Sequence, residues 1–169
     1  MEILLINRAK IAQYKQIAKS VYDDVLNQNI LEAQFQDLRH LLGERLYYDL
    51  LANATSSTYT DLLNGGVYTI NGIARTNEGL KKCLVYYAFA RYSMFGGVTD
   101  TPFNMVEKLN GQESRPVSTE FKKTIYQNNR DIAYNVWLSV EIYLRLTNNQ
   151  LFTNNCNQKR QSFKISKIW

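Results

Sequence analysis

The middle of the chain decides its fold, because residues 77–97 read NEGLKKCLVYYAFARYSMFGG. Six side chains recur there at the spacing of one helical face: Leu80, Leu84, Tyr87, Ala88, Arg91 and Phe95. Val85, Phe89 and Tyr92 make the other sides apolar as well. A helix that is apolar nearly all round is a buried one. The sequence therefore predicts a core helix from about Asn77 to Phe95, stopped by Gly96–Gly97.

Four further helices are predicted before this one. Asn7 is a good N-cap residue, and it begins a helix that ends in the polar run 27–29. The next helix covers about 30–42 and is stopped by Gly43. Its expected apolar face is Leu31, Phe35, Leu38 and Leu42. A third helix covers 44–53, and a short one covers 59–64 before Gly65–Gly66.

A β-hairpin is predicted between the short helix and the core helix. Val67–Ile70 and Ile73–Thr76 are β-forming runs that flank Asn71–Gly72. Asn-Gly suits a two-residue turn, because both turn positions need a positive φ. An isolated hairpin is marginally stable in water, so this one is expected to lie on the body of the protein or on a neighbour.

The C-terminal half is predicted to hold a long helix between two extended segments. Pro102 and Pro116 exclude one continuous helix over 99–116, and 103–109 reads as an edge strand. Ser118 caps a helix that would reach Thr147, about 30 residues or roughly 45 Å long. The final 162–169 alternates apolar and basic residues, which is typical of a short strand.

The predicted fold class is thus mainly α: a helical bundle with a buried central helix, a long C-terminal helix, a β-hairpin and a short terminal strand. Residues 1–147 would form the helical domain, with the hairpin inserted near 66–76. Residues 148–169 would form a basic extension, because the five charged residues after Glu141 are all basic. A basic end suits nucleic acid or an acidic partner, and it is also compatible with a solvated tail.

Catalytic and cofactor motifs are not recognisable in the sequence. His40 stands alone, and the phosphate-cradling glycine loops and metal-ligand spacings are missing. Glu32, Asp37, Glu44 and Asp49 are predicted on polar helix faces, and Cys83 as a small buried side chain. The sequence indicates no enzyme, no cofactor and no metal site. The short apolar start has no signal-peptide features, and the longest apolar run is too short for a membrane span, so a soluble cytoplasmic product is expected.

A set of structural motifs carries a resemblance to a known family. They are Leu41–Leu42–Gly43 with Leu46–Tyr47, Tyr59 with Leu62–Leu63–Asn64–Gly65–Gly66 and Tyr68–Thr69, Asn71–Gly72, Gly79–Leu80–Lys81 with Tyr86–Tyr92, Thr101–Pro102–Phe103, and Ser114 with Pro116–Val117–Ser118. Over about 30–120 and the long helix that follows, the chain resembles head–tail connector proteins of Bacteroidetes and crAss-like phages. That family offers no catalytic residues to transfer.

The resemblance implies a structural virion protein, assembled in the host bacterial cytoplasm and located at the head–tail junction. Its implied partners are copies of itself in a ring, dodecameric in such adaptors, the portal protein above it, and tail or further ring proteins. Packaged DNA could be contacted without sequence specificity, and a membrane is not implied. The candidate interface residues are Tyr68, Ile70, Asn71, Phe103, Phe163, Ile165 and Trp169. The candidates for the DNA channel or an acidic partner are Lys159, Arg160, Lys164 and Lys167.

A second interpretation of the sequence is a nucleic-acid-binding helical module. It would use the basic end, with Tyr126, Tyr134 or Trp169 as stacking platforms. Against it, residues 1–141 contain equal numbers of acidic and basic residues, so no broad basic face is visible in the sequence.

Overall fold

A computed structural model describes residues 3–17, 22–95, 98–100, 105–107 and 117–152. The helices are α1 (Arg8–Ala12), α2 (Asp23–Ala33), the π-helical segment η1 (Gln34–Leu38), α3 (Arg39–Leu42), α4 (Glu44–Ala52), the 3-10 turn η2 (Ser57–Tyr59), α5 (Thr60–Asn64), α6 (Leu80–Phe95) and α7 (Thr119–Leu146). The strands are β1 (Gly66–Ile70), β2 (Ile73–Asn77), β3 (Val98–Asp100) and β4 (Met105–Glu107). The mainly helical fold predicted from the sequence is confirmed.

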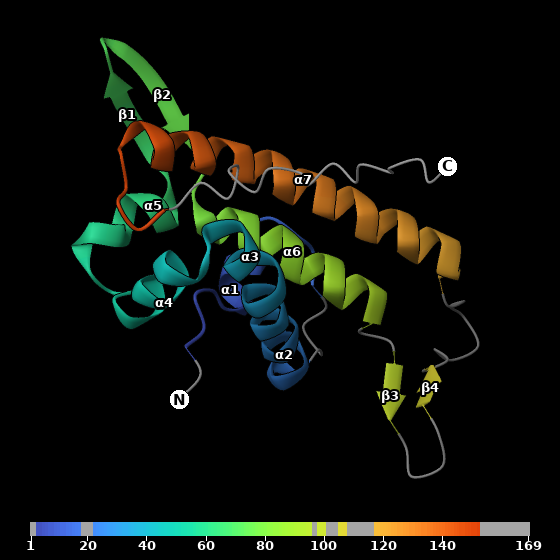
Figure 1. The fold of residues 1–169 in the computed structure, drawn as a ribbon. Helices are drawn as coiled ribbons and strands as arrows, with labels where there is room; N and C mark the ends of the chain where they lie inside the picture. Colours follow the sequence, from blue (N-terminus) through green and yellow to red (C-terminus); the bar gives the residue numbers. More distant parts are fainter. Residues whose placement is uncertain (1–2, 18–21, 96–97, 101–104, 108–116, 153–169) are drawn as a thin grey trace, which may run out of the picture.

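The core is built around α6, as its sequence predicts. α6 and α7 lie side by side along most of their length, and α2 crosses α6 (Figure 1). Leu80, Leu84 and Val85 are almost wholly buried, and Arg91 is buried on the same helix. Phe95, expected on the buried face, is instead 51% exposed, because it lies at the end of the helix.

The long C-terminal helix is also confirmed. Ser118 caps α7 by accepting a hydrogen bond from the Phe121 backbone N–H. The helix has 28 residues. At 1.5 Å per residue it is about 42 Å long. Beyond it, the Phe152 ring packs edge-on to Trp137, with 6.1 Å between the ring centroids. The predicted strand at 162–169 lies outside the described residues.

The prediction for the N-terminal helices is partly wrong. Asn7 does cap a helix, accepting a hydrogen bond from the Lys10 N–H, but α1 ends at Ala12. The run 27–29 lies inside α2, and helix continues through η1 and α3 to Leu42. Packing outweighs the weak helical preference of asparagine here, because Leu26 and Ile30 are fully buried. The Asn29 amide donates to the Val25 carbonyl at 2.7 Å instead of breaking the helix.

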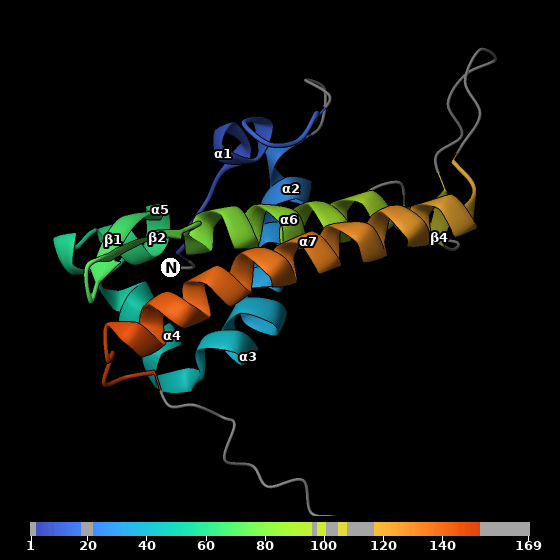
Figure 2. The same ribbon diagram turned by 90° about the horizontal axis from the view of Figure 1, so that it is seen from above.

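Two hairpins project from opposite ends of the α6/α7 pair (Figures 1 and 2). β1 and β2 pair antiparallel around the predicted turn, where Asn71 and Gly72 have φ of 54° and 77°. β3 and β4 form the second hairpin. The extended segment predicted at 103–109 is therefore a strand at Met105–Glu107, while Phe103 lies outside the described residues.

Candidate assembly surfaces

The second half of α7 exposes a line of apolar side chains, called here the α7 stripe. Its members are Tyr134, Leu138, Ile142 and Leu146, which are 52%, 38%, 44% and 41% exposed. A spacing of four residues places them on successive turns of the same side of the helix. The opposite side is buried against the core through residues such as Trp137 and Val140. Contiguous exposed apolar side chains of this kind are typical of protein–protein contact surfaces.

The β1–β2 hairpin is anchored to its own chain on one side only. The Tyr68 ring lies edge-on to Tyr143 of α7, with 5.1 Å between ring centroids. Burial, with Asp61 and Tyr68 nearby, raises the pKa of the Tyr143 phenol. Val67 and Ile73, in contrast, are 74% and 58% exposed. These two apolar side chains are exposed, whereas Tyr68 is half-buried beside Tyr143.

The remaining predicted contact residues divide into two groups. Ile70 is half-buried in β1, and Asn71 is exposed at the turn. The others lie outside the described residues: Phe103, Phe163, Ile165, Trp169, Lys159, Arg160, Lys164 and Lys167. The structure thus brings Tyr68, Ile70 and Asn71 together on one hairpin, next to the C-terminal part of α7.

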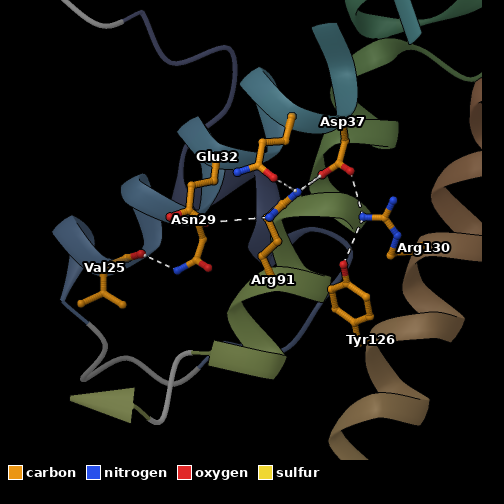
Figure 3. Close-up of polar contacts among 8 residues, drawn as sticks. Val25, Asn29, Glu32, Asp37, Arg91, Tyr126 and Arg130 are labelled. Carbon is orange, nitrogen blue, oxygen red and sulfur yellow. Dashed lines mark hydrogen bonds and ion pairs between the residues drawn. The ribbon is translucent and has the colours of Figure 1, made fainter. Parts of the chain in front are cut away.

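A buried ionic cluster joins three elements of the bundle at Asp37 of η1. One carboxylate oxygen, Oδ2, accepts from Nε of Arg91 at 3.0 Å and lies 2.9 Å from its Nη2. The other, Oδ1, accepts from Nη1 of Arg130 on α7 at 2.8 Å (Figure 3). Glu32 lies 3.9 Å from Arg91, and Gln36 accepts from it at 3.3 Å. The prediction that Asp37 lies on a polar helix face is wrong, since the side chain is 7% exposed.

Aromatic rings complete the cluster on the α7 side. The Arg130 guanidinium lies 5.2 Å from the Tyr87 ring centroid and 5.5 Å from that of Tyr126. Burial lowers the pKa of Arg130, but the hydrogen bond and the charge of Asp37 outweigh burial and raise it. Arg130 therefore stays charged, and the one Asp37 carboxylate binds both arginines. With so little of Asp37 exposed, the cluster joins η1, α6 and α7 through contacts inside the bundle.

The sequence holds one signal for this cluster. Arg91 falls on the apolar face of the core helix. A buried charge needs a partner of opposite sign, so a buried carboxylate was to be expected somewhere. Which carboxylate it was depended on long-range packing, because Asp37 lies 54 residues away in the sequence.

Reactive groups elsewhere in the described residues are few. Cys83 is wholly buried, as predicted, and its thiol lies 3.3 Å from the Ala133 carbonyl oxygen. Burial, with Asp37 nearby, raises the pKa of this thiol well above its usual range. His40 is exposed. Within the described part of the chain, acidic, cysteine and histidine side chains form no group suited to a metal ion. There too, no helix has both the length and the apolar character to cross a bilayer.

These features define a class: a mainly helical protein, fixed internally by a buried ionic cluster, that leaves apolar faces uncovered. The chain belongs to the family of unknown function DUF6712, which matches residues 38–162. Comparisons with curated proteins and with solved structures give no significant match.

Proposed function

We propose that this protein is a structural ring subunit at the head–tail junction of a tailed phage, docking beneath the portal. The phage assignment comes from the resemblance of the motifs between Leu41 and Ser118. The observation that carries the assembly role is the α7 stripe, four half-exposed apolar side chains on one face of a 28-residue helix. A subunit that stayed alone would leave this face in water at a cost of about 25 cal/mol per Å² of apolar surface.

The placement of the two hairpins supports a ring rather than a symmetric dimer. A ring subunit needs two different surfaces, since each copy contacts one neighbour on each side. The β1–β2 and β3–β4 hairpins lie at opposite ends of the α6/α7 pair (Figure 1). Hairpins suit such contacts because their free edges can pair with another backbone.

The decisive experiment removes the protein from the phage. We expect particles assembled without it to contain packaged DNA in heads that carry no tail, as seen by electron microscopy. Normal tailed particles would refute the junction role. A chain that stays monomeric and binds DNA with strong salt dependence would favour the nucleic-acid-binding alternative instead.

The α7 stripe can be tested separately by complementation with Leu138→Ser/Ile142→Ser. Both side chains are about 40% exposed, so the helical circular dichroism should be kept, while the melting temperature should fall because the remainder of each side chain is buried in the bundle. Incorporation into particles should fall strongly, because a neighbour would now bury two hydroxyls in an apolar contact. Phe121→Ser is the matched control on the same helix, since Phe121 is 57% exposed and lies outside the stripe. If the double variant enters particles as well as Phe121→Ser and the wild type do, the stripe is not part of the interface.

A further inference from the structure

Phe35 stands as a ridge between two surface hollows of different character. On one side is an apolar groove of about 400 Å³, lined chiefly by Ile3, Leu31, Tyr47 and Leu51. On the other is a polar hollow of about 420 Å³ that contains Arg39, His40 and Arg45. Phe35 itself is 51% exposed, although its sequence pattern predicts a buried position. The two hollows and the ridge are called here the Phe35 ridge site.

The geometry of this site is fixed by the fold. Gln34 is 2% exposed, and its amide binds the N-terminal segment through two hydrogen bonds. Its Nε2 donates to the Ile3 carbonyl at 2.9 Å, and its Oε1 accepts from the Leu5 N–H at 2.8 Å. Ile3 is therefore held as one wall of the apolar groove. The Arg39 guanidinium lies 3.9 Å from the Phe35 ring centroid. This cation–π contact holds the Phe35 ring on the side that faces the polar hollow.

The polar hollow, with Arg39 and Arg45, offers positive charge to a partner. Arg45 and His40 are exposed. Arg39 faces Glu44 at 3.8 Å, too long for a hydrogen bond, and the Glu44 side chain is 77% exposed. The site therefore favours an occupant with one large apolar side chain for the groove and acidic groups for the neighbouring hollow.

The opposite end of the same helical rod has that chemistry. α2, η1 and α3 run without a break from Asp23 to Leu42. At the start, Tyr22 is 77% exposed, and Asp23, Asp24 and Val25 are exposed beside it. Asp23 also forms an ion pair with Arg8 at 2.6 Å, so its charge is partly neutralised within the chain. Tyr22 and Phe35 are thirteen positions apart, or roughly 20 Å along a helix.

We propose that the Tyr22–Val25 end of one copy docks on the Phe35 ridge site of the next copy. The Tyr22 ring enters the apolar groove, and the Asp23 and Asp24 carboxylates face Arg39 and Arg45. Because the two surfaces differ and lie at opposite ends of one rod, the contact is head-to-tail and repeats from copy to copy. This inference rests on the proposed ring function and names one contact between its subunits.

Removal of either apolar partner tests the contact in the full-length chain. In sedimentation velocity over a concentration series, Tyr22→Ser and Phe35→Ser should each weaken self-association at least about tenfold. Both side chains are more than half exposed, so circular dichroism and melting should remain those of the wild type. Phe121→Ser, at 57% exposure, is the matched control and should associate normally. If Tyr22→Ser or Phe35→Ser self-associates as strongly as the wild type, the proposal is overturned.

A charge exchange adds an outcome that mere loss of stability cannot produce. Asp23→Lys/Asp24→Lys and Arg39→Glu/Arg45→Glu should each, on its own, weaken self-association at least as strongly as the serine variants. An equimolar mixture of the two should associate again, because the reversed end of the first variant faces the reversed site of the second, and the unchanged end of the second faces the unchanged site of the first. A mixture that stays monomeric overturns the proposal.

The proposed function can fail independently of this contact. A wild-type chain that remains monomeric at millimolar concentration overturns the contact, whatever its particles look like. Tailed particles assembled without the protein overturn the ring function, even if the charge exchange behaves as expected.

Discussion

Replacement of Asp37 by alanine should be among the most damaging single changes in the bundle. The carboxylate makes hydrogen bonds to Arg91 at 3.0 Å and to Arg130 at 2.8 Å, and the Arg91 side chain is 10% exposed. After the change, Arg91 would keep Gln36 at 3.3 Å and Glu32 at 3.9 Å. Loss of one partner of a buried ion pair costs about 3–5 kcal/mol, because the other charge stays buried without compensation.

Urea unfolding followed by far-ultraviolet circular dichroism measures this cost. With a denaturant slope of about 2 kcal/mol per molar urea, Asp37→Ala should lower the unfolding midpoint by roughly 2 M. The protomer concentration must be the same for all variants, because self-association adds apparent stability. Asp131→Ala is the matched control on α7, where the exposed carboxylate accepts only from the Gln127 amide among the contacts described, at 2.9 Å. It should change the unfolding free energy by about 0.5 kcal/mol or less.

A double variant distinguishes the cost of the unpaired charge from the cost of the cavity that Asp37→Ala leaves. Asp37→Leu/Arg91→Met fills the same space with apolar atoms and leaves no unpaired charge at these two positions. It should recover at least half of the stability lost in Asp37→Ala, since apolar replacements of buried ion pairs are often neutral. The reasoning is refuted if Asp37→Ala unfolds like the Asp131 control, or if the double variant is no more stable than Asp37→Ala.

Two further predictions concern the hairpin and the core cysteine. Gly65→Ala should destabilise the protein by well over 1 kcal/mol, because Gly65 has φ +82° and a Cβ there would lie 2.4 Å from the Asn77 carbonyl oxygen. Gly66→Ala, with open space around its Cβ, should be close to neutral in the same urea titration. In a Cys156→Ser background, Cys83 should react with a thiol reagent only as fast as the protein opens, since it is wholly buried and burial raises its pKa. Rapid labelling of the folded chain would contradict the observed burial.

Local patterns were enough to predict the elements whose geometry is set within a few residues. Asn71–Gly72 specified the hairpin turn, because positive φ at both positions suits few other residue pairs. Gly43 and Gly65 ended helices for the same conformational reason, with φ of 77° and 82°. Ser118 placed the start of α7, because its hydroxyl caps the first turn.

Other features depended on which helices meet, and local patterns predicted them poorly. The polar run 27–29 indicated a loop, yet the core on either side of it keeps α2 helical. Phe35 matched an apolar stripe, yet it is half exposed and shapes a surface site. Apolar side chains also occur on more than one side of α7, and only packing showed that the α7 stripe is the side that remains uncovered.

The amino-acid pattern alone was therefore enough to predict the class of fold, the core helix, the hairpin and the ends of several helices, because periodicity, caps and turn residues act over short distances along the chain. The burial of Asp37, its contacts with Arg91 and Arg130, and the apolar faces left for neighbours became known only from the folded structure. The reason is distance along the chain: Arg130 lies 93 residues from the carboxylate it binds. A contact of that separation is specified by the packing of whole helices against one another.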